Sequence, residues 1–191
     1  MLIALHKPFG VISQFSDRTG SAGVTLSDFV SIPGVYPAGR LDKNSEGLLL
    51  LTDNGALQHK ISHPSKATDK EYWVQLEGKL GDKSGNEFAG KLCRGLDLAD
   101  GFIAATSALP LHTPEQQDAI TALGPHPGRL AEHRNQNSTW FTVTLTSGKN
   151  RIVRRFCAAL GHPVLRLVRT RIGNIKLGTL AAGESRHEEW G

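Results

Sequence analysis

One short segment places an acidic side chain next to a cationic one, directly before an apolar run. Asp42 follows Arg40, and the polar stretch 43–47 separates it from the run Leu48–Leu51. A continuous apolar run bounded by turn residues is typical of a strand buried on both faces. The pattern therefore predicts a carboxylate on a loop held by a rigid sheet, a common position for a catalytic group. A structural ion pair or turn cap formed by Asp42 and Arg40 is the alternative.

A second group of charged residues lies towards the C-terminus. The chain of 191 residues has a formal net charge of only +4, yet residues 149–176 contain eight basic and no acidic residues. A basic segment on an otherwise slightly acidic chain is typical of a binding site for a polyanion, although a solvated charged face gives the same pattern. The basic residues are Lys149, Arg151, Arg154, Arg155, Arg166, Arg169, Arg171 and Lys176.

The first part of this segment predicts a helix over residues 150–160, ended by Gly161 and Pro163. At about 100° per residue, its arginines fall on the side opposite an apolar stripe. Planar guanidinium groups on that side suit phosphate or carboxylate groups. The stripe consists of Ile152, Val153, Phe156, Ala159 and Leu160.

The remaining pattern predicts an α+β fold with a largely antiparallel sheet, because short strands outnumber helices and tight turns join them. Alternating apolar residues predict strands over 71–77 and 140–145. Residues 113–138 are rich in Pro, Gly, Gln, Asn and His, and we interpret them as an insertion or a mobile connection.

The sequence argues against a metal site, a disulfide framework, a membrane span and a secretory signal. His59 and His63 have the spacing of a metal pair on a helix, but no third ligand is placed beside them, so no metal site is expected. Cys93 and Cys157 lie too far apart for a zinc ribbon and do not form a disulfide framework, which favours a reducing, cytoplasmic setting. No apolar run approaches the roughly 20 residues that cross a bilayer, and no secretory signal is visible.

Several segments, taken in order, match the motifs of a known family. Gly39–Asp42 followed by Ser45–Thr52 resembles the active-site motif of the RsuA-type ribosomal RNA pseudouridine synthases. His6–Val11 is similar to the opening turn of that family, Lys70–Val74 to one of its strands, and Gly148–Phe156 to its basic helix. The resemblance extends over most of the chain.

The resemblance implies a single catalytic domain over residues 1–191, with a central, mainly antiparallel mixed sheet in two halves flanked by helices. It implies an active-site cleft between the halves. Many members of the family begin with a small RNA-binding domain of the S4 type, and we expect none here, because this sequence starts directly at the catalytic segment. The implied activity is isomerisation of a uridine in large-subunit (23S) ribosomal RNA, without a metal or organic cofactor. The implied partner is this RNA or an assembling large ribosomal subunit, and the implied state is a cytoplasmic monomer.

The resemblance also implies roles for particular residues. Asp42 is the catalytic carboxylate, Tyr72 packs against the target base, Arg154 pairs with Asp42, and Leu167 packs beside the base. Ile152 stands where relatives usually have Gln, so no substrate contact is carried over to it. The expected phosphate contacts come from Lys7, Arg40, Lys149, Arg151, Arg155, Arg166, Arg169 and Arg171.

Three other functions remain open at this point. The same basic surface could serve a non-catalytic RNA-binding or ribosome-assembly protein, with Asp42 as scaffold. A pseudouridine synthase could act on another RNA. A glycoside hydrolase could use Asp42 and Glu46 as its pair of carboxylates, although arginine-rich segments suit phosphates better than neutral sugars.

Overall fold

The computed structural model describes residues 1–16, 23–128, 130 and 132–191, which form two compact units. Unit 1 contains Met1–Glu71 and Val168–Gly191, and unit 2 contains Tyr72–Leu167. Strands β4 (Lys70–Glu77) and β9 (Val164–Ile172) each contribute residues to both units. Each unit combines strands with helices, which confirms the α+β class. No helix in the described part of the chain has the length and apolar character to cross a membrane.

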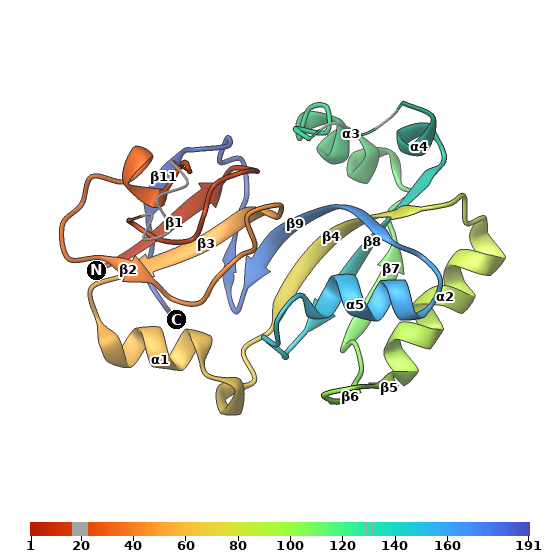
Figure 1. Ribbon diagram of the computed structural model, residues 1–191, viewed down its shortest axis with the longest axis horizontal. Coiled ribbons are helices and arrows are strands. Elements are labelled where there is room, and N and C mark those ends of the chain that lie inside the picture. Colours follow the sequence, from red (N-terminus) through yellow and green to blue (C-terminus); the bar gives the residue numbers. More distant parts are fainter. Residues whose placement is uncertain (17–22, 129, 131) are drawn as a thin grey trace. The chain divides into compact units, whose positions relative to one another are not determined.

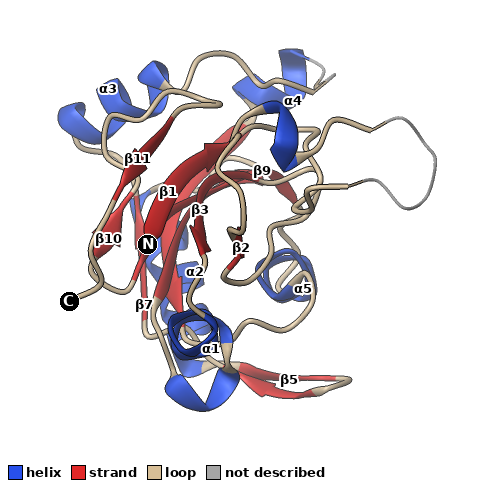
Figure 2. Ribbon diagram, turned by 90° about the vertical axis from the view of Figure 1, so that its left-hand side faces the viewer, coloured by secondary structure: helices blue, strands red, loops and turns tan. Residues whose placement is uncertain are grey.

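The strands of unit 1 follow the order β11-β1-β3-β9. Strand β1 (Leu2–Lys7) lies between β3 (Glu46–Thr52) and β11 (Ser185–His187) and is antiparallel to both (Figure 2). Because β9 runs parallel to β3, the sheet is mixed, as expected. The short strands β2 (Tyr36–Pro37) and β10 (Ile175–Lys176) pair with β3 and β9, respectively.

Strand β3 is buried at every position, as the apolar run predicts. Its neighbouring helix α1 (Gly55–Ser62) begins at Asn54, whose Oδ1 accepts hydrogen bonds from the amides of Ala56 and Leu57 at 3.0 and 3.1 Å. Alternate residues of β1 and β3 and side chains from the loops form one apolar cluster. This cluster consists of Ile3, Leu5, Val11, Leu26, Val30, Val35, Leu49 and Leu51.

The strands of unit 2 follow the order β9-β4-β8-β7. Strand β8 (Ser138–Leu145) is antiparallel to β7 (Ser107–Pro110), and helix α2 (Asp82–Arg94) packs on β7. Strands β5 (Leu96–Leu98) and β6 (Gly101–Ile103) form a separate hairpin. In Figure 1 this hairpin lies at the lower end of the unit, and helices α3 (Pro114–Ala122) and α4 (Glu132–Gln136) lie at its upper end.

Helix α5 (Ile152–Ala159) confirms the basic helix and corrects part of its apolar stripe. Ile152, Val153 and Phe156 are buried as predicted, but Ala159 is exposed and Cys157 is fully buried instead. The buried face of the helix is therefore rotated slightly about the helix axis from the predicted one, towards Cys157 and away from Ala159.

The segment 113–138, interpreted as an insertion or a mobile connection, contains two helices in its described residues, which exclude 129 and 131. They are α3 (Pro114–Ala122) and α4 (Glu132–Gln136). Thr113 and Gln116 form a capping box at the start of α3, where the Gln116 carboxamide oxygen accepts from the Thr113 amide at 3.0 Å. Pro114 occupies the first helical position, where the absence of its amide hydrogen costs nothing.

Candidate active site

The backbone around Asp42 is held in a tight turn before β3. The Ser45 amide donates to the Asp42 carbonyl at 3.0 Å, and the Gly10 amide donates to the next carbonyl of the turn at 2.8 Å. On the other side, the buried Ser13 hydroxyl donates to the Leu41 carbonyl at 2.8 Å and accepts from the Leu41 amide at 3.1 Å. The half-buried Asp42 side chain is therefore carried on a backbone that is fixed from both sides.

Lys7 is a buried cation within electrostatic reach of Asp42. Its side chain is 0% exposed, and Nζ donates to two backbone carbonyls of its own turn at 2.8 and 2.7 Å. Burial lowers the pKa of Lys7 to about 8, and the positive charge of Arg169 adds to this effect. The negative charges of Glu46 and Asp42 act in the opposite direction. In the free protein the Lys7 ammonium is therefore enclosed, and its contact with RNA stays a prediction.

Arg169 is a second buried cation of unit 1. Its side chain is 3% exposed, Nε donates to the Leu48 carbonyl at 2.7 Å, and Nη1 donates to the Arg40 carbonyl at 3.4 Å. Nη2 has no hydrogen-bond partner among the described residues. Lys70 is also buried, and burial together with the charge of Arg169 lowers its pKa to about 8. Asp42 therefore lies in a unit whose interior carries several positive charges, a setting that suits a polyanionic substrate.

Tyr72 and Arg154 belong to unit 2, whereas Asp42 belongs to unit 1, so the predicted contacts among these three side chains stay predictions. Tyr72 is 7% exposed on β4. Arg154 lies in the first turn of α5, and its Nη1 donates to the Val164 carbonyl at 3.1 Å. Burial raises the pKa of the Cys157 thiol to about 12, and the Arg154 charge only partly opposes this shift.

Three of the expected phosphate contacts surround the start of α5. Arg155 forms a two-point ion pair with the Asp100 carboxylate, and the Nη1–Oδ2 distance is 3.0 Å. Lys149 Nζ donates to the Asp100 carbonyl. Hydrogen bonding from Arg155 lowers the pKa of Asp100 to about 2. Arg151 is exposed and precedes the helix in a left-handed conformation with φ of 48°.

The other expected contacts are engaged within their own units. Arg166 and Leu167 are buried, and the Arg166 guanidinium donates to backbone carbonyls of residues 123–125, the nearest at 2.8 Å. Arg171 is half-buried, and its Nε lies 3.5 Å from a carboxylate oxygen of Glu71. Their contacts with RNA also stay predictions.

The structure shows positioning residues that the sequence analysis missed. Ser13 holds the backbone before Asp42 through its hydrogen bonds to Leu41. The sequence signal for this role is a single hydroxyl side chain directly after the apolar pair Val11 and Ile12. Lys70 lies inside one of the family motifs, but the motif alone does not show that this lysine is buried, or that the charge of Arg169, which is distant in sequence, helps to lower its pKa.

His59 and His63 do not form a metal pair in the structure. Their rings stack with centroids 4.4 Å apart, and His63 Nδ1 lies 2.8 Å from the Ser65 hydroxyl. Stacked rings do not aim their in-plane nitrogen lone pairs at a common ion. Nowhere in the described ranges do three His, Cys, Asp or Glu side chains gather in a way that could hold a metal.

Comparisons with known proteins agree on one family. The family model described as RNA pseudouridylate synthase matches residues 1–159. The chain is 42% identical to ribosomal large subunit pseudouridine synthase E of Xanthomonas campestris pv. campestris, over 99% of this chain and 96% of the relative. It is 39% identical to the protein of the same name in Vibrio parahaemolyticus, over 96% of this chain and 71% of the relative.

Solved structures give the same result for the fold. A crystal structure of a pseudouridylate synthase aligns with a TM-score of 0.70 at 25% identity, covering 97% of this chain and 68% of that one. A chain of an H/ACA ribonucleoprotein bound to a substrate RNA aligns with a TM-score of 0.59 at 16% identity, covering 92% and 48%. The second likeness concerns the fold alone.

Proposed function

Because this chain belongs to the RNA pseudouridylate synthase family, we propose that it isomerises a uridine of 23S ribosomal RNA to pseudouridine. The observation that carries this proposal is the similarity, over nearly the whole chain, to relatives named for the large ribosomal subunit. The proposed enzyme is a single catalytic domain that acts as a cytoplasmic monomer, on free 23S RNA or on an assembling large subunit.

The proposed chemistry breaks one bond of the nucleoside and forms another. The N1–C1′ bond breaks, the uracil turns over while it stays in the site, a C5–C1′ bond forms, and the proton on C5 is replaced by one on N1. Asp42 is the proposed nucleophile or base, and its fixed turn supports that role because a displaced carboxylate loses most of its effect. Tyr72 is the proposed platform for the base, and Arg154 the proposed partner of the carboxylate.

RNA binding in this proposal depends on the cations of both units. Extruding a uridine from folded RNA costs a few kcal/mol, which contacts with phosphates offset. Arg40, Lys149 and Arg151 are exposed in the free protein and are therefore the first candidates. Arg155 is bound to Asp100 and would exchange that carboxylate for a phosphate. Lys7, Arg166, Arg169 and Arg171 are buried or half-buried in the free protein and remain proposed phosphate contacts, and Leu167 is proposed to pack beside the base.

Mapping pseudouridine tests the proposal. We expect one pseudouridine of 23S RNA to be absent from cells that lack this protein and to return with the wild-type gene. Asp42→Asn removes the anionic oxygen with little change in shape, so we expect it to restore no modification while purified variant still binds the RNA.

The matched control is Asp97→Asn, which removes a carboxylate from an exposed position on β5. We expect this variant to restore the modification fully. Unchanged modification by Asp42→Asn would reject the role of Asp42. An unaltered pseudouridine map in cells without the protein, together with RNA binding by the purified chain, would favour the non-catalytic RNA-binding function.

A further inference from the structure

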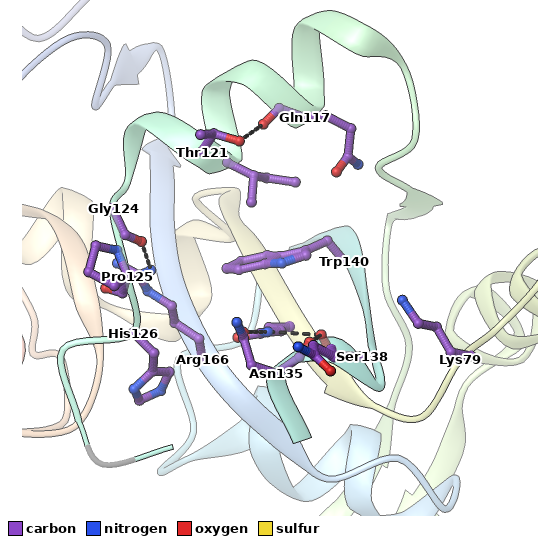
Figure 3. Close-up of a pocket in the computed structure, with 13 residues that line it drawn as sticks. Lys79, Gln117, Thr121, Gly124, Pro125, His126, Asn135, Ser138, Trp140 and Arg166 are labelled. Carbon is purple, nitrogen blue, oxygen red and sulfur yellow. Dashed lines mark hydrogen bonds between the residues drawn. The ribbon is translucent and has the colours of Figure 1, made fainter. Parts of the chain in front are cut away.

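Unit 2 contains a pocket that includes none of the proposed catalytic residues. Its volume is about 540 Å³, within the range of roughly 300–1,000 Å³ that is usual for small-molecule sites. It lies between the helices of the 113–138 segment and strands β4, β8 and β9. Figure 3 shows the indole of Trp140 projecting across the pocket, between Gln117 and Thr121 of α3 on one side and Asn135 and Ser138 on the other.

Hydrogen bonds from two buried side chains hold the walls of this pocket. Gln75, which is 2% exposed, donates through Nε2 to Asn135 Oδ1 at 2.7 Å and to Ser138 Oγ at 2.9 Å. Arg166, which is 5% exposed, donates to the carbonyls that end α3 and the loop after it, with Gly124 at 2.8 Å. A cation at a helix C-terminus is favourable. The pocket is therefore formed before any ligand arrives.

Trp140 gives the pocket a half-buried aromatic surface. The indole N–H of Trp140 donates no hydrogen bond to any residue that the structure describes. This N–H is not among the buried polar atoms that lack a partner, so it is accessible from the pocket. Both the ring face and the N–H are therefore open to a ligand. Indole faces bind flat π systems, and nucleic-acid bases are the flat groups that stack on them most often in RNA-binding proteins.

The charge of the pocket is positive. Its lining contains Lys79 and Arg166 but no Asp or Glu. Lys79 is exposed, and across the described ranges it forms no ion pair or hydrogen bond through its ammonium. In Figure 3 Lys79 and Arg166 lie on opposite sides of Trp140. Asn135 adds an amide whose Nδ2 is not used by Gln75. Gln117 donates through Nε2 to the Leu111 carbonyl, and its carboxamide oxygen accepts no hydrogen bond from the residues that the structure describes.

The groups that line the pocket match those of a nucleotide: an aromatic face for the face of the base, amide groups for its polar edge, and cations for the phosphate. We propose that this pocket binds one unpaired nucleotide of the RNA substrate, distinct from the uridine that is isomerised. The base stacks on Trp140, Asn135 and Gln117 contact its polar edge, and the phosphate faces Lys79. This inference rests on the proposed function for the identity of the RNA, but the binding site itself can be tested without any reaction.

The first experiment uses the indole N–H signals of the three tryptophans in the ¹⁵N-labelled full chain. The Trp140 signal is assigned by its loss in Trp140→Phe. We expect AMP, GMP, CMP or UMP at millimolar concentration to shift the Trp140 signal, whereas those of Trp73 and Trp190 stay in place. We expect ribose 5-phosphate and inorganic phosphate to shift it much less, because neither carries a base.

A shift of equal size with inorganic phosphate would replace the nucleotide proposal with a simple anion site. No shift with any of the four nucleotides, together with a KM that does not respond to Trp140→Ala, would overturn the proposal. Lys79→Gln, an exposed substitution that cannot disturb the core, is expected to weaken nucleotide binding about threefold or more by removing one phosphate contact.

The second experiment measures pseudouridine formation on transcribed 23S RNA. Loss of one base stack in Trp140→Ala is expected to raise KM by about fivefold to a hundredfold, while kcat changes less than about twofold. Trp140→Phe keeps a ring and is expected to restore most of the affinity. Leu109→Ala truncates an exposed apolar residue of the same unit that does not line the pocket, and it should leave both constants unchanged.

The two experiments separate the failure of this inference from that of the proposed function. An active enzyme whose KM does not respond to Trp140→Ala, and whose Trp140 signal ignores nucleotides, overturns the inference and leaves the function standing. A chain that binds nucleotides at Trp140 but forms no pseudouridine in any ribosomal RNA keeps the site and overturns the proposed function. A loss of kcat in Trp140→Ala that Trp140→Phe does not restore would assign Trp140 a structural role instead.

Discussion

Gly47 packs so closely against Arg169 that no side chain fits between them. A Cβ on Gly47 would lie 2.3 Å from the Arg169 carbonyl oxygen and 2.6 Å from its amide nitrogen, and Gly47 has a φ of +102°. The two residues are partners in the parallel pairing of β3 and β9. This contact explains why a glycine stands inside the segment that follows Asp42: it brings the buried Arg169 against the strand that the Asp42 turn enters.

Gly47→Ala is expected to lower the free energy of unfolding by about 2–5 kcal/mol, because it adds a steric clash to a strained backbone. Urea unfolding measures this loss. Gly34→Ala is the control, since Gly34 has a φ of +79° but open space around its Cβ position. That variant is expected to lose only about 1–2 kcal/mol. Equal losses of unfolding free energy in the two variants would show that the close contact between Gly47 and Arg169 does not contribute to stability.

The buried lysines Lys7 and Lys70 predict a rise in stability between pH 8 and pH 10. Each has a pKa of about 8 in the folded chain against a usual value of 10.5. Between these two values the unfolded chain binds more protons than the folded one, so the free energy of unfolding increases with pH. Below pH 8 both lysines are charged in both states, and their cost to the fold is fully present.

Urea unfolding of wild type and of Lys7→Met/Lys70→Met from pH 7 to pH 10 tests this effect. The quantity to compare is the difference between the two proteins, because the thiol of Cys157 acts with the opposite sign. Its folded pKa of about 12 lies above its usual 9.0, so it lowers stability above about pH 9 in both proteins. The difference between wild type and variant is expected to change in favour of the wild type as the pH rises. A difference in unfolding free energy that does not change with pH would contradict the predicted effect of the two lysines.

The fold around Asp42 could be predicted because its signals are local. Four consecutive leucines, Leu48–Leu51, form part of a strand that is buried at every position. The polar residues before them form the turn that holds the backbone of Asp42. Strand β4 and helix α5 were found in the same way, by the periodicity of their own side chains.

The exposure of the cations could not be predicted in this way. Lys7, Arg169 and Arg151 look alike in a charge pattern, yet the first two are 0% and 3% exposed and the third is exposed. Burial of Arg169 depends on the carbonyl of Leu48, which lies 121 residues away in the sequence. Charge alone does not indicate such a partner, so the set of residues that face RNA needs the structure.

Helix α3 was missed for a different reason. None of its residues is buried, so the helix has no apolar stripe for a periodicity argument to detect. Its start was nevertheless visible in the run Thr113, Pro114 and Gln116, which combines a capping box with a proline at the first helical position. Capping signals therefore have to be considered separately from periodicity, above all in a segment that forms one wall of a pocket.

The two cysteines are expected to differ in reactivity. Burial raises the pKa of Cys157 to about 12 and removes its sulfur from solvent, whereas Cys93 is exposed. Iodoacetamide at pH 8 is therefore expected to modify one cysteine of the native chain, and mass spectrometry of Cys93→Ser should show none modified. Both cysteines should react in urea. Modification of Cys157 in the native chain would show that the core around α5 opens readily.

Asp100→Asn is expected to strengthen RNA binding. In the free protein Asp100 holds Arg155 through two hydrogen bonds and receives another from Lys149 at its carbonyl, so a phosphate must compete with this carboxylate for the guanidinium. Removing the negative charge removes that competition, and the RNA dissociation constant is expected to fall about twofold to fivefold at low salt, less at high salt. Filter binding across a salt series measures the change.

Asp118→Asn on α3, an exposed carboxylate with no ion pair in the described part of the chain, controls for the added net charge. Equal effects of the two substitutions would mean that RNA responds to the total charge alone. Weaker binding in Asp100→Asn would mean that the ion pair holds Arg155 in the orientation that RNA requires.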